Sequence, residues 1–414
     1  MRRVAVIAYH SSPLIEPGVG DAGGMTVYVR EVARVMAKLG IRTDVFTRST
    51  SGDIEVTDIF PAVRVVAIPA GPAQSLSKSE LVEHVGEFAE RIATFATENR
   101  HDYELIHSHY WQSGLAGAEL ARRWDIPLVH SNHTLAKVKN RFLPPGDTPE
   151  PASRVEGEAA VIRAADTLIA STDEEFQHLA CLYGASHDRL KTIYPGVDHS
   201  LFSPGSKAGA RTELGLDQDE AILTFVGRIQ PLKGLDLAFK ALHQLVGPLA
   251  GKVQLVVVGG ASGPAGGDEA AELRRLADDL GISDHVQFTG PHPHDRTPLF
   301  YRAADVCVVT SFSESFGLSA LEAQACGTPV VGTDVGGLRH IVRDGKSGFL
   351  LESRDPSEFA ARLKTLLSDP DLRSRFSDDA IGSSASFTWD RTGRELADLY
   401  ECLITERAPE FCTC

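Results

Sequence analysis

Residues 311–332, SFSESFGLSALEAQACGTPVVG, decide the fold of this chain. The stretch follows an apolar run at 305–310 that is typical of a buried strand, and it predicts a helix that ends at Gly327 before a second strand, PVVG. A loop that leads from a strand into a helix leaves unpaired backbone N–H groups at the positive end of the helix dipole. The stretch therefore predicts a strand, a loop, a helix and a strand, with a seat for a phosphate at the loop.

Glu314 and Glu322 lie eight residues apart in this stretch, which is about two helical turns. An ionised carboxylate accepts hydrogen bonds from two hydroxyls at once, so it suits a sugar ligand. We interpret Glu322 as a ligand of a ribose diol, Glu314 as a ligand of a sugar hydroxyl, and the loop amides as ligands of a diphosphate. Two solvated acids on a surface helix would have the same spacing, so the pair by itself leaves both interpretations open.

The alternation of strands and helices extends through the rest of the chain. Apolar strands separated by helices predict parallel, doubly wound sheets, whose ligands lie beyond the carboxyl ends of the strands. Beyond Gly348 the chain is predicted to be mainly helical. The predicted strands are 3–8, 42–47, 63–68, 104–108, 127–131, 166–171, 221–226, 253–258, 285–289 and 305–310, and the predicted helices of the first half are 25–39, 79–99, 112–123 and 151–165.

A segment with turn-forming prolines and a glycine, IYPGVDHSLFSP at 193–204, separates two series of strands and helices. We therefore predict an α/β protein with a first domain at residues 1–198 and a second domain at residues 199–386. The remaining segment, 387–414, is expected to contain a final helix at 387–406 that packs back on the first domain.

The composition is that of an ordinary globular protein, with 43% hydrophobic and 23% charged residues among 414. The net charge of −15 argues against a general nucleic-acid surface, and no apolar run approaches the length of a membrane span or of a signal peptide. We expect a cytoplasmic protein with small-molecule substrates, no nucleic-acid partner and no membrane span, and we leave a homodimer open. Cys307 and Cys326 lie in apolar segments and are expected in the core, while a role for Cys412 and Cys414 stays open.

The first loop at a strand end, HSSPLIEPGVGDAGGM at 10–25, contains a formal GxGxxG pattern that begins at Gly18. An NAD-dependent oxidoreductase would explain the pattern, but its fingerprint needs a tight turn, whereas a long loop separates Tyr9 from Gly18. We favour a backbone nest that approaches a ligand closely, with Gly24 at the helix start. The oxidoreductase remains an alternative.

Histidines follow two other strands, at His107 and His109 and at His130 and His133. Imidazoles are common zinc ligands, so these four residues offer a zinc site as one interpretation. Histidines at strand ends also serve to satisfy hydrogen bonds, and nothing supplies an obvious open coordination position. We favour the second interpretation and expect no metal. His133 is of particular interest because a hydroxyl residue, Thr134, follows it.

Arg228 and Lys233 lie in a loop, GRIQPLKG, that begins where the first strand of the second half ends. Two cations at that position are well placed to neutralise phosphates, although two solvated basic residues would look the same if the loop stood alone. A later loop, GGASGP at 259–264, has the small residues that allow a nucleoside to approach.

Together these segments resemble the retaining glycosyltransferases of family 4, which have the GT-B fold, over essentially the whole chain. Within that family the chain is similar to enzymes that move N-acetylglucosamine from UDP-N-acetylglucosamine to an inositol phosphate in mycothiol biosynthesis. The matching segments are HSSPL, GDAGGMTVY, AGPAQSLSKSEL, YELIHSHYW, HTLAKVKN, DTPE, GRIQPLKG, GGASGP and the stretch at 311–332.

The resemblance implies two facing Rossmann-like domains with the active site in the cleft between them. It implies a catalytic set of His133, Glu314, Arg228 and Lys233. The donor-binding residues would be Gly24, Arg228, Lys233, Phe316, Gly317, Leu318 and Glu322, and the acceptor-binding residues would be His10, Asp21, Thr26, Lys78, Tyr110, Thr134 and Arg154.

The resemblance also implies that no cofactor is required and that a nucleotide sugar, UDP-linked, is the co-substrate. Two positions depart from the family pattern: Thr26 replaces an asparagine that faces the acceptor, and His292 stands where an arginine near the nucleobase is usual. Sucrose-phosphate synthases share much of the framework, so a hexose phosphate remains an alternative acceptor, as does an acceptor from specialised metabolism. A non-catalytic protein that binds nucleotide sugars is a further alternative.

Overall fold

The computed structural model describes residues 3–18, 20, 22–261 and 266–407. The elements of the first half are β1 Arg3–Ile7, α1 Gly24–Lys38, β2 Arg42–Ser49, β3 Glu55–Phe60, β4 Val63–Pro69, α2 Lys78–Leu81, α3 Val85–Glu98, β5 Leu105–His109, α4 Trp111–Trp124, β6 Leu128–Ser131, α5 Ala136–Arg141, α6 Ala152–Ala164, β7 Thr167–Ala170, α7 Asp173–Tyr183 and β8 Leu190–Thr192. Those of the second half are α8 Lys207–Leu214, β9 Ala221–Val226, α9 Leu235–Val246, β10 Val253–Val258, α10 Gly266–Asp279, β11 Val286–Gly290, α11 Thr297–Ala303, β12 Val306–Val309, α12 Leu318–Ala325, β13 Val330–Thr333, α13 Leu338–Ile341, β14 Gly348–Leu351, α14 Pro356–Ser368, α15 Pro370–Ser384 and α16 Trp389–Arg407.

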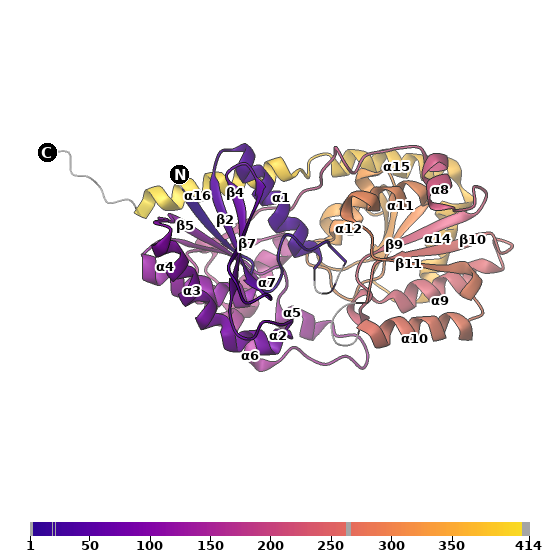
Figure 1. Ribbon diagram of the computed structural model, residues 1–414. Coiled ribbons are helices and arrows are strands. Elements are labelled where there is room, and N and C mark those ends of the chain that lie inside the picture. The colour runs from indigo at the N-terminus through magenta and orange to yellow at the C-terminus, as the bar shows by residue number, and fades with distance from the viewer. Residues whose placement is uncertain (1–2, 19, 21, 262–265, 408–414) are drawn as a thin grey trace.

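The strands form two separate sheets that lie side by side in Figure 1. Within the described residues, the strand order of the first sheet is β3-β4-β2-β1-β5-β6-β7-β8 and that of the second is β11-β10-β9-β12-β13-β14. Neighbouring strands are parallel, except that β3 pairs antiparallel with β4. The expected α/β architecture of two Rossmann-like domains, as in the GT-B fold, is confirmed.

Helices cover both faces of the first sheet because its central strands are apolar on both sides. In β1, Ala5 and Ile7 pack in the core that α3 and α4 complete, whereas Val4 and Val6 pack in the core that α1 completes. Strand neighbours alternate between faces, so a continuous apolar run is what a sheet buried on both sides requires. The second sheet follows the same rule, with VQLVVV of β10 buried at nearly every position.

The last helix, α16, crosses back to the first domain, where Figure 1 shows it along the edge of that domain. Leu396 and Tyr400 of α16 are buried in the same core as α1, and the ring of Trp389 meets that of Tyr28 edge-on, with the ring centroids 5.6 Å apart. The limits 1–198, 199–386 and 387–414 of the three segments stay a prediction.

Three strands escaped the sequence prediction: β3, β8 and β14. β3 is an exposed edge strand, β8 has only three residues, and β14 lies in the part predicted to be mainly helical. The helix predicted at 79–99 is helical throughout most of its length, but a 3-10 turn at Val82–His84 separates α2 from α3. None of the helices in the described ranges combines the length and the apolar character that a membrane crossing needs.

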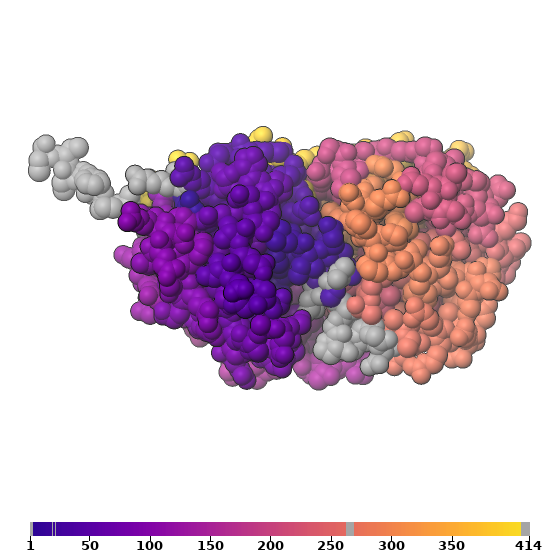
Figure 2. Space-filling view, viewed as in Figure 1, coloured from indigo at the N-terminus to yellow at the C-terminus, as the bar shows by residue number. Residues whose placement is uncertain are grey.

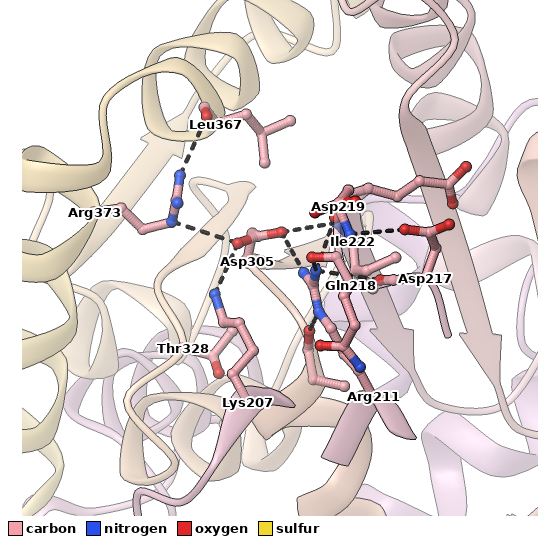
Figure 3. Close-up of polar contacts among 12 residues, drawn as sticks. Lys207, Arg211, Asp217, Gln218, Asp219, Ile222, Asp305, Thr328, Leu367 and Arg373 are labelled. Atoms are coloured by element: carbon pink, nitrogen blue, oxygen red, sulfur yellow. Dashed lines mark hydrogen bonds and ion pairs between the residues drawn. The ribbon is translucent and has the colours of Figure 1, made fainter. Parts of the chain in front are cut away.

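A buried carboxylate, Asp305, ties the second domain together at the start of β12 (Figure 3). Its Oδ1 accepts from Lys207 Nζ at 2.7 Å, and its Oδ2 accepts from Arg211 Nη2 at 2.9 Å and from the Ile222 amide at 2.8 Å. Arg373 of α15 lies 3.5 Å from the same Oδ1. The cluster joins α8, β9, β12 and α15 at the amino end of β12, opposite to the strand ends where ligands are expected.

Candidate active site

A cavity of about 470 Å³ lies between the two domains, at the carboxyl ends of strands from both sheets. In Figure 2 the indigo and purple lobe of the first domain meets the orange and pink lobe of the second along one boundary. Most of the predicted site residues line this cavity. They are His10, Gly24, Lys78, Tyr110, His133, Thr134 and Arg154 from the first domain and Arg228, Lys233, Glu314, Phe316, Gly317, Leu318 and Glu322 from the second.

The two other predicted acceptor residues are Asp21 and Thr26. Asp21 lies outside the described residues. Thr26 is buried in the first turn of α1, where its Oγ1 lies 2.8 Å from Ser11 Oγ. The cavity wall at this turn is formed instead by the neighbours of Thr26, Met25 and Val27. The exchange of asparagine for threonine is therefore accommodated inside the first domain, and a contact of Thr26 with the acceptor gains no support.

The loop between β12 and α12 presents the start of a helix to the cavity, as predicted. Gly317 precedes α12 with φ +101°, a conformation that glycine adopts readily, and a Cβ there would lie 2.7 Å from Leu338 Cδ2. Phe316 is buried in the core beneath the loop. The amides at the start of α12 are therefore held by rigid packing at the edge of the cavity.

Lys233 reaches the same loop from the other side. Its Nζ donates to Glu314 Oε2 at 2.6 Å, and Ser311 Oγ donates to the same oxygen at 3.1 Å. The backbone of Glu314 is also fixed, since its carbonyl accepts from the Gly337 amide at 3.0 Å. The predicted phosphate ligand and the predicted sugar ligand are thus direct neighbours.

The glycine loop of the first domain closes over this region. A Cβ on Gly23 would lie 3.2 Å from Arg228 Nε, and a Cβ on Gly24 would lie 3.4 Å from Leu318 Cδ1. The absence of side chains at these two glycines lets Arg228 and the start of α12 approach the first domain. The long loop therefore brings backbone close to the second domain, in agreement with the nest interpretation and not with the tight turn of a dinucleotide fingerprint.

Glu322 lies deep in the wall, with partners that the sequence did not reveal. Its Oε1 accepts from His294 Nε2 at 2.7 Å, and its Oε2 accepts from the Tyr301 hydroxyl at 2.9 Å. Burial alone would lower the pKa of His294, but the Glu322 carboxylate outweighs it and raises that pKa above its usual value. Both oxygens of Glu322 are therefore oriented before any ribose hydroxyl arrives.

A second polar region lies on the first domain, around the ring of Tyr110. Arg154 Cζ lies 5.0 Å and Lys78 Nζ lies 6.0 Å from the centroid of that ring. Arg154 Nη2 also donates to Thr134 Oγ1 at 2.9 Å. The four residues predicted to bind a phosphate are therefore brought together from four segments of the chain.

Arg154 has two acidic partners that the sequence did not single out. Arg154 Nε donates to Glu158 Oε1 at 2.8 Å, and Arg154 Nη1 lies 2.8 Å from Glu150 Oε1. Lys139 pairs with the same oxygen of Glu150. The spacing of Arg154 and Glu158 on α6, four residues, was the available signal, since residues at this spacing share a helix face.

His10 and His133 complete the wall of the first domain. The His10 ring packs against Tyr110 at a centroid distance of 4.5 Å, and its Nδ1 has no hydrogen-bond partner in the described part of the chain. His133 has φ +59°, and its Nε2 lies 2.9 Å from His109 Nδ1. Burial lowers the pKa of both His10 and His133 to about 3, with the charge of Lys78 adding to the effect at His10, so both imidazoles are neutral at physiological pH.

The remaining histidines are engaged with hydroxyl groups. His107 contacts the hydroxyls of Tyr400 and Ser131 through its two nitrogens, and His130 Nδ1 lies 2.8 Å from Ser108 Oγ. Among the residues that the structure describes, no group of three or more His, Cys, Asp or Glu side chains is arranged to hold a metal ion.

A further acid of the wall, Glu175, escaped the sequence analysis. Its Oε2 accepts from the Ser171 amide at 2.7 Å, while Oε1 is buried without a hydrogen-bond partner among residues 3–18, 20, 22–261 and 266–407. Burial raises the pKa of Glu175 to about 7. The sequence context, an acid three residues after Thr172, signalled only a helix cap.

This arrangement holds cations and helix amides on one side of the cavity and a cationic, hydroxyl-rich region on the other. It can bind two anionic substrates that face each other and can stabilise a negatively charged leaving group. The wall between them supplies neutral imidazoles and carboxylates for sugar hydroxyls.

Comparison with known proteins agrees with this chemistry. A family model described as Glycosyl transferase 4-like domain matches residues 23–196, and one described as Glycosyl transferases group 1 matches residues 206–382. A D-inositol 3-phosphate glycosyltransferase of Acidothermus cellulolyticus is 48% identical over 98% of this chain and 91% of its own length. D-inositol 3-phosphate glycosyltransferase 2 of Catenulispora acidiphila is 47% identical over 98% and 96%.

Among solved structures, sucrose-phosphate synthase from Thermosynechococcus elongatus superposes with a TM-score of 0.91 at 30% identity, covering 98% of this chain and 100% of that one. This likeness extends over both domains, and the family models match one domain each. The reaction class is therefore glycosyl transfer rather than nicotinamide-dependent oxidation. The chain belongs to the glycosyltransferases of family 4 and has their GT-B fold.

Proposed function

We propose that this glycosyltransferase moves N-acetylglucosamine from UDP-N-acetylglucosamine to 1D-myo-inositol 3-phosphate, with retention of configuration, as in mycothiol-type biosynthesis. The observation that carries the acceptor is the meeting of Lys78, Tyr110, Thr134 and Arg154 at one side of the cavity. Charge-assisted hydrogen bonds from such a set are roughly twice as strong as neutral ones, so they suit a phosphate. The names of the relatives quoted above support the same acceptor.

The donor is proposed to bind on the second domain. Arg228, Lys233 and the amides at Phe316, Gly317 and Leu318 would hold the diphosphate, and Glu322 would hold the ribose. Glu314, which already contacts Lys233, would bind a hydroxyl of the transferred sugar. No residue is assigned as a covalent nucleophile.

The chemical step is proposed to depend on charge stabilisation. The acceptor hydroxyl attacks the anomeric carbon on the face that the diphosphate leaves, and its proton passes to the departing diphosphate. Arg228, Lys233 and the helix amides stabilise the charge that builds on that diphosphate, a kind of contribution that is worth roughly 3–4 kcal/mol for one well-aimed donor. His133, neutral and held by His109, orients the sugar rather than acting as a base.

A hexose phosphate such as that used by sucrose-phosphate synthases is the second candidate acceptor. The likeness to sucrose-phosphate synthase over both whole chains favours it, and a phosphate pocket alone does not distinguish a hexose from an inositol ring.

A screen of nucleotide sugars against acceptors, read by mass spectrometry, tests the proposal. UDP-N-acetylglucosamine with 1D-myo-inositol 3-phosphate is expected to give the glycosylated phosphate, and NMR of the anomeric proton is expected to show the configuration of the donor. If a product forms only with fructose 6-phosphate, the acceptor is a hexose phosphate and the proposed inositol phosphate is wrong. An inverted anomeric centre would overturn the mechanism.

A further inference from the structure

Glu150 is a cavity-facing partner of Arg154, which is proposed to bind the acceptor's phosphate, and of Lys139, which also lines the cavity. It lies between α5 and α6, in a stretch without helix or strand, and its side chain lines the cavity with 19% of its surface exposed. One oxygen, Oε1, contacts both Arg154 Nη1, at 2.8 Å, and Lys139 Nζ. A single carboxylate thus pairs with two cations of the pocket.

The other acidic partner of Arg154, Glu158, is built into the domain. Its side chain is 1% exposed, and its oxygens accept from the Ala136 amide, from the Tyr183 hydroxyl and from Arg154 Nε. If this carboxylate moved away, the buried donors that it pairs with would lose their hydrogen bonds, which is costly. Glu158 is therefore the fixed partner that orients the Arg154 guanidinium, whereas Glu150 is the partner that another anion can replace.

Each nitrogen of the Arg154 guanidinium has a partner in the empty pocket, and Glu150 is the partner that faces the cavity. Nε points to Glu158 and Nη2 points to Thr134, while Nη1 faces Glu150. A phosphate that binds Arg154 and Thr134 from the cavity would meet the Glu150 carboxylate at close range. Like charges at such a distance repel each other strongly in a partly desolvated site.

The Glu150 side chain can leave this position while its backbone stays fixed. The Glu150 amide donates to Asn140 Oδ1 at 2.7 Å, and its carbonyl accepts from Asn140 Nδ2 at 3.4 Å. The backbone contacts with Asn140 do not involve the carboxylate, so they are kept when the side chain rotates away from Arg154 and Lys139.

We propose that Glu150 is a built-in competitor of the acceptor's phosphate, which occupies Arg154 and Lys139 in the empty pocket and is displaced when the phosphate binds. The carboxylate is ionised in the empty pocket: burial alone would raise the pKa of Glu150, but Arg154 and Lys139 outweigh it and hold the pKa below its usual value. A phosphate monoester carries close to two negative charges at neutral pH, so its attraction to Arg154 and Lys139 exceeds that of the Glu150 carboxylate, which it displaces. An anion with one negative charge has no such advantage over Glu150. Glu150 therefore makes the pocket selective for a phosphate over anions with one negative charge. This inference rests on the proposed acceptor.

Glu150→Gln tests the proposal, with Asp147→Asn as the matched control. Asp147 lies in the same stretch and carries the same charge, but it is not among the residues that line the cavity. Its Oδ1 accepts from the Thr148 amide. Steady-state kinetics with 1D-myo-inositol 3-phosphate are expected to show a KM about tenfold lower for Glu150→Gln, because one charge-assisted competitor is removed. The KM for the donor, and both KM values of Asp147→Asn, are expected to match the wild type.

An unchanged or higher KM for the phosphorylated acceptor in Glu150→Gln would overturn the proposal, since a residue that merely supports Arg154 would weaken binding when altered. Glu150→Asp, which keeps the charge on a shorter side chain, is expected to lower the KM by a smaller factor and serves if the glutamine variant does not fold. If the wild type does not use inositol phosphate at all, the proposed function fails, and inorganic phosphate titrated by calorimetry decides the role of Glu150. Tighter phosphate binding by Glu150→Gln than by the wild type supports competition, and equal or weaker binding refutes it.

Discussion

Lys233 Nζ lies 2.6 Å from Glu314 Oε2, although the two residues follow different strands of the second sheet. Lys233 lies just before α9, in the loop that follows β9, and Glu314 lies in the loop that follows β12. β9 and β12 are neighbours in the sheet, so their carboxyl ends deliver the cation and the acid to one place. The proposed phosphate and sugar positions of the donor therefore adjoin, as they must at the bond that breaks.

Replacing Lys233 or Arg228 by alanine is expected to lower kcat/KM by roughly a hundredfold or more, about 3 kcal/mol, because each removes positive charge from the leaving diphosphate. Steady-state kinetics with saturating acceptor measure the effect. Lys240→Ala is the control, since Lys240 is a half-exposed residue of α9 that pairs with Asp236 outside the cavity lining. Wild-type turnover by either site variant would remove that residue from the mechanism.

Turnover is expected to be insensitive to metal chelation. The cations of Arg228 and Lys233 and the amides at the start of α12 are proposed to neutralise the diphosphate, which is the task of a magnesium ion in many other transferases. Activity is measured after dialysis against EDTA and again after magnesium or zinc is added. Activity lost in EDTA and restored by either metal would return the histidines at 107, 109 and 130 to consideration as ligands.

Loss of the Arg154 guanidinium is expected to affect the acceptor and not the donor. Arg154→Ala should lower kcat/KM for inositol phosphate by tenfold or more, about 1.4 kcal/mol, and spare slow hydrolysis of the donor. Arg154→Ala also leaves the buried Glu158 without its counter-ion. Thr134→Val is therefore measured beside it, since it removes one contact of the pocket and keeps the buried ion pair. An unphosphorylated acceptor used as well as its phosphate would refute the pocket.

Sequence reasoning located most of the fold because the signals were continuous and local. Buried parallel strands such as β10, VQLVVV, are apolar at nearly every position, and their carboxyl ends mark where ligand loops belong. β3 escaped because an exposed edge strand has no such run, and β8 because three residues carry too little pattern.

The hydrogen-bond and ion-pair partners of the site residues could not be predicted from the sequence, because they come from segments that are distant along the chain. Nothing near Glu322 indicated that His294 and Tyr301 would take both of its oxygens, and nothing near Arg154 indicated Lys139 as a neighbour of Glu150. At Thr26 the sequence predicted a contact with the acceptor, because the residue replaces an asparagine that faces the acceptor in the family pattern. In the structure its hydroxyl instead contacts Ser11 inside the domain.

Asp305→Asn is expected to destabilise the protein by about 3–5 kcal/mol, because it leaves the buried Arg211 without its counter-ion. Urea unfolding followed by circular dichroism measures the change. Lys207→Ala serves as the control, since Lys207 is 42% exposed and an exposed ion pair contributes at most about 1 kcal/mol. A loss below about 1 kcal/mol for Asp305→Asn would show that the cluster in Figure 3 is not needed for stability.

Glu175 is expected to make the stability of the protein fall as the pH rises through the neutral range. Burial raises the pKa of its carboxyl from 4.5 to about 7, so between these values the folded protein holds a proton that the unfolded chain has lost. The unfolded state then binds fewer protons, and the free energy of unfolding decreases with pH in this window, by roughly 3 kcal/mol in total.

Glu175→Gln cannot ionise and still offers an oxygen to the Ser171 amide, so its stability relative to the wild type should grow between pH 4.5 and pH 7.5. Urea unfolding of both proteins at the two ends of this range measures the difference, with Glu156→Gln on the exposed face of α6 as the surface control. A stability difference between Glu175→Gln and the wild type that is equal at both ends would mean that the pKa of Glu175 is not raised in the folded protein.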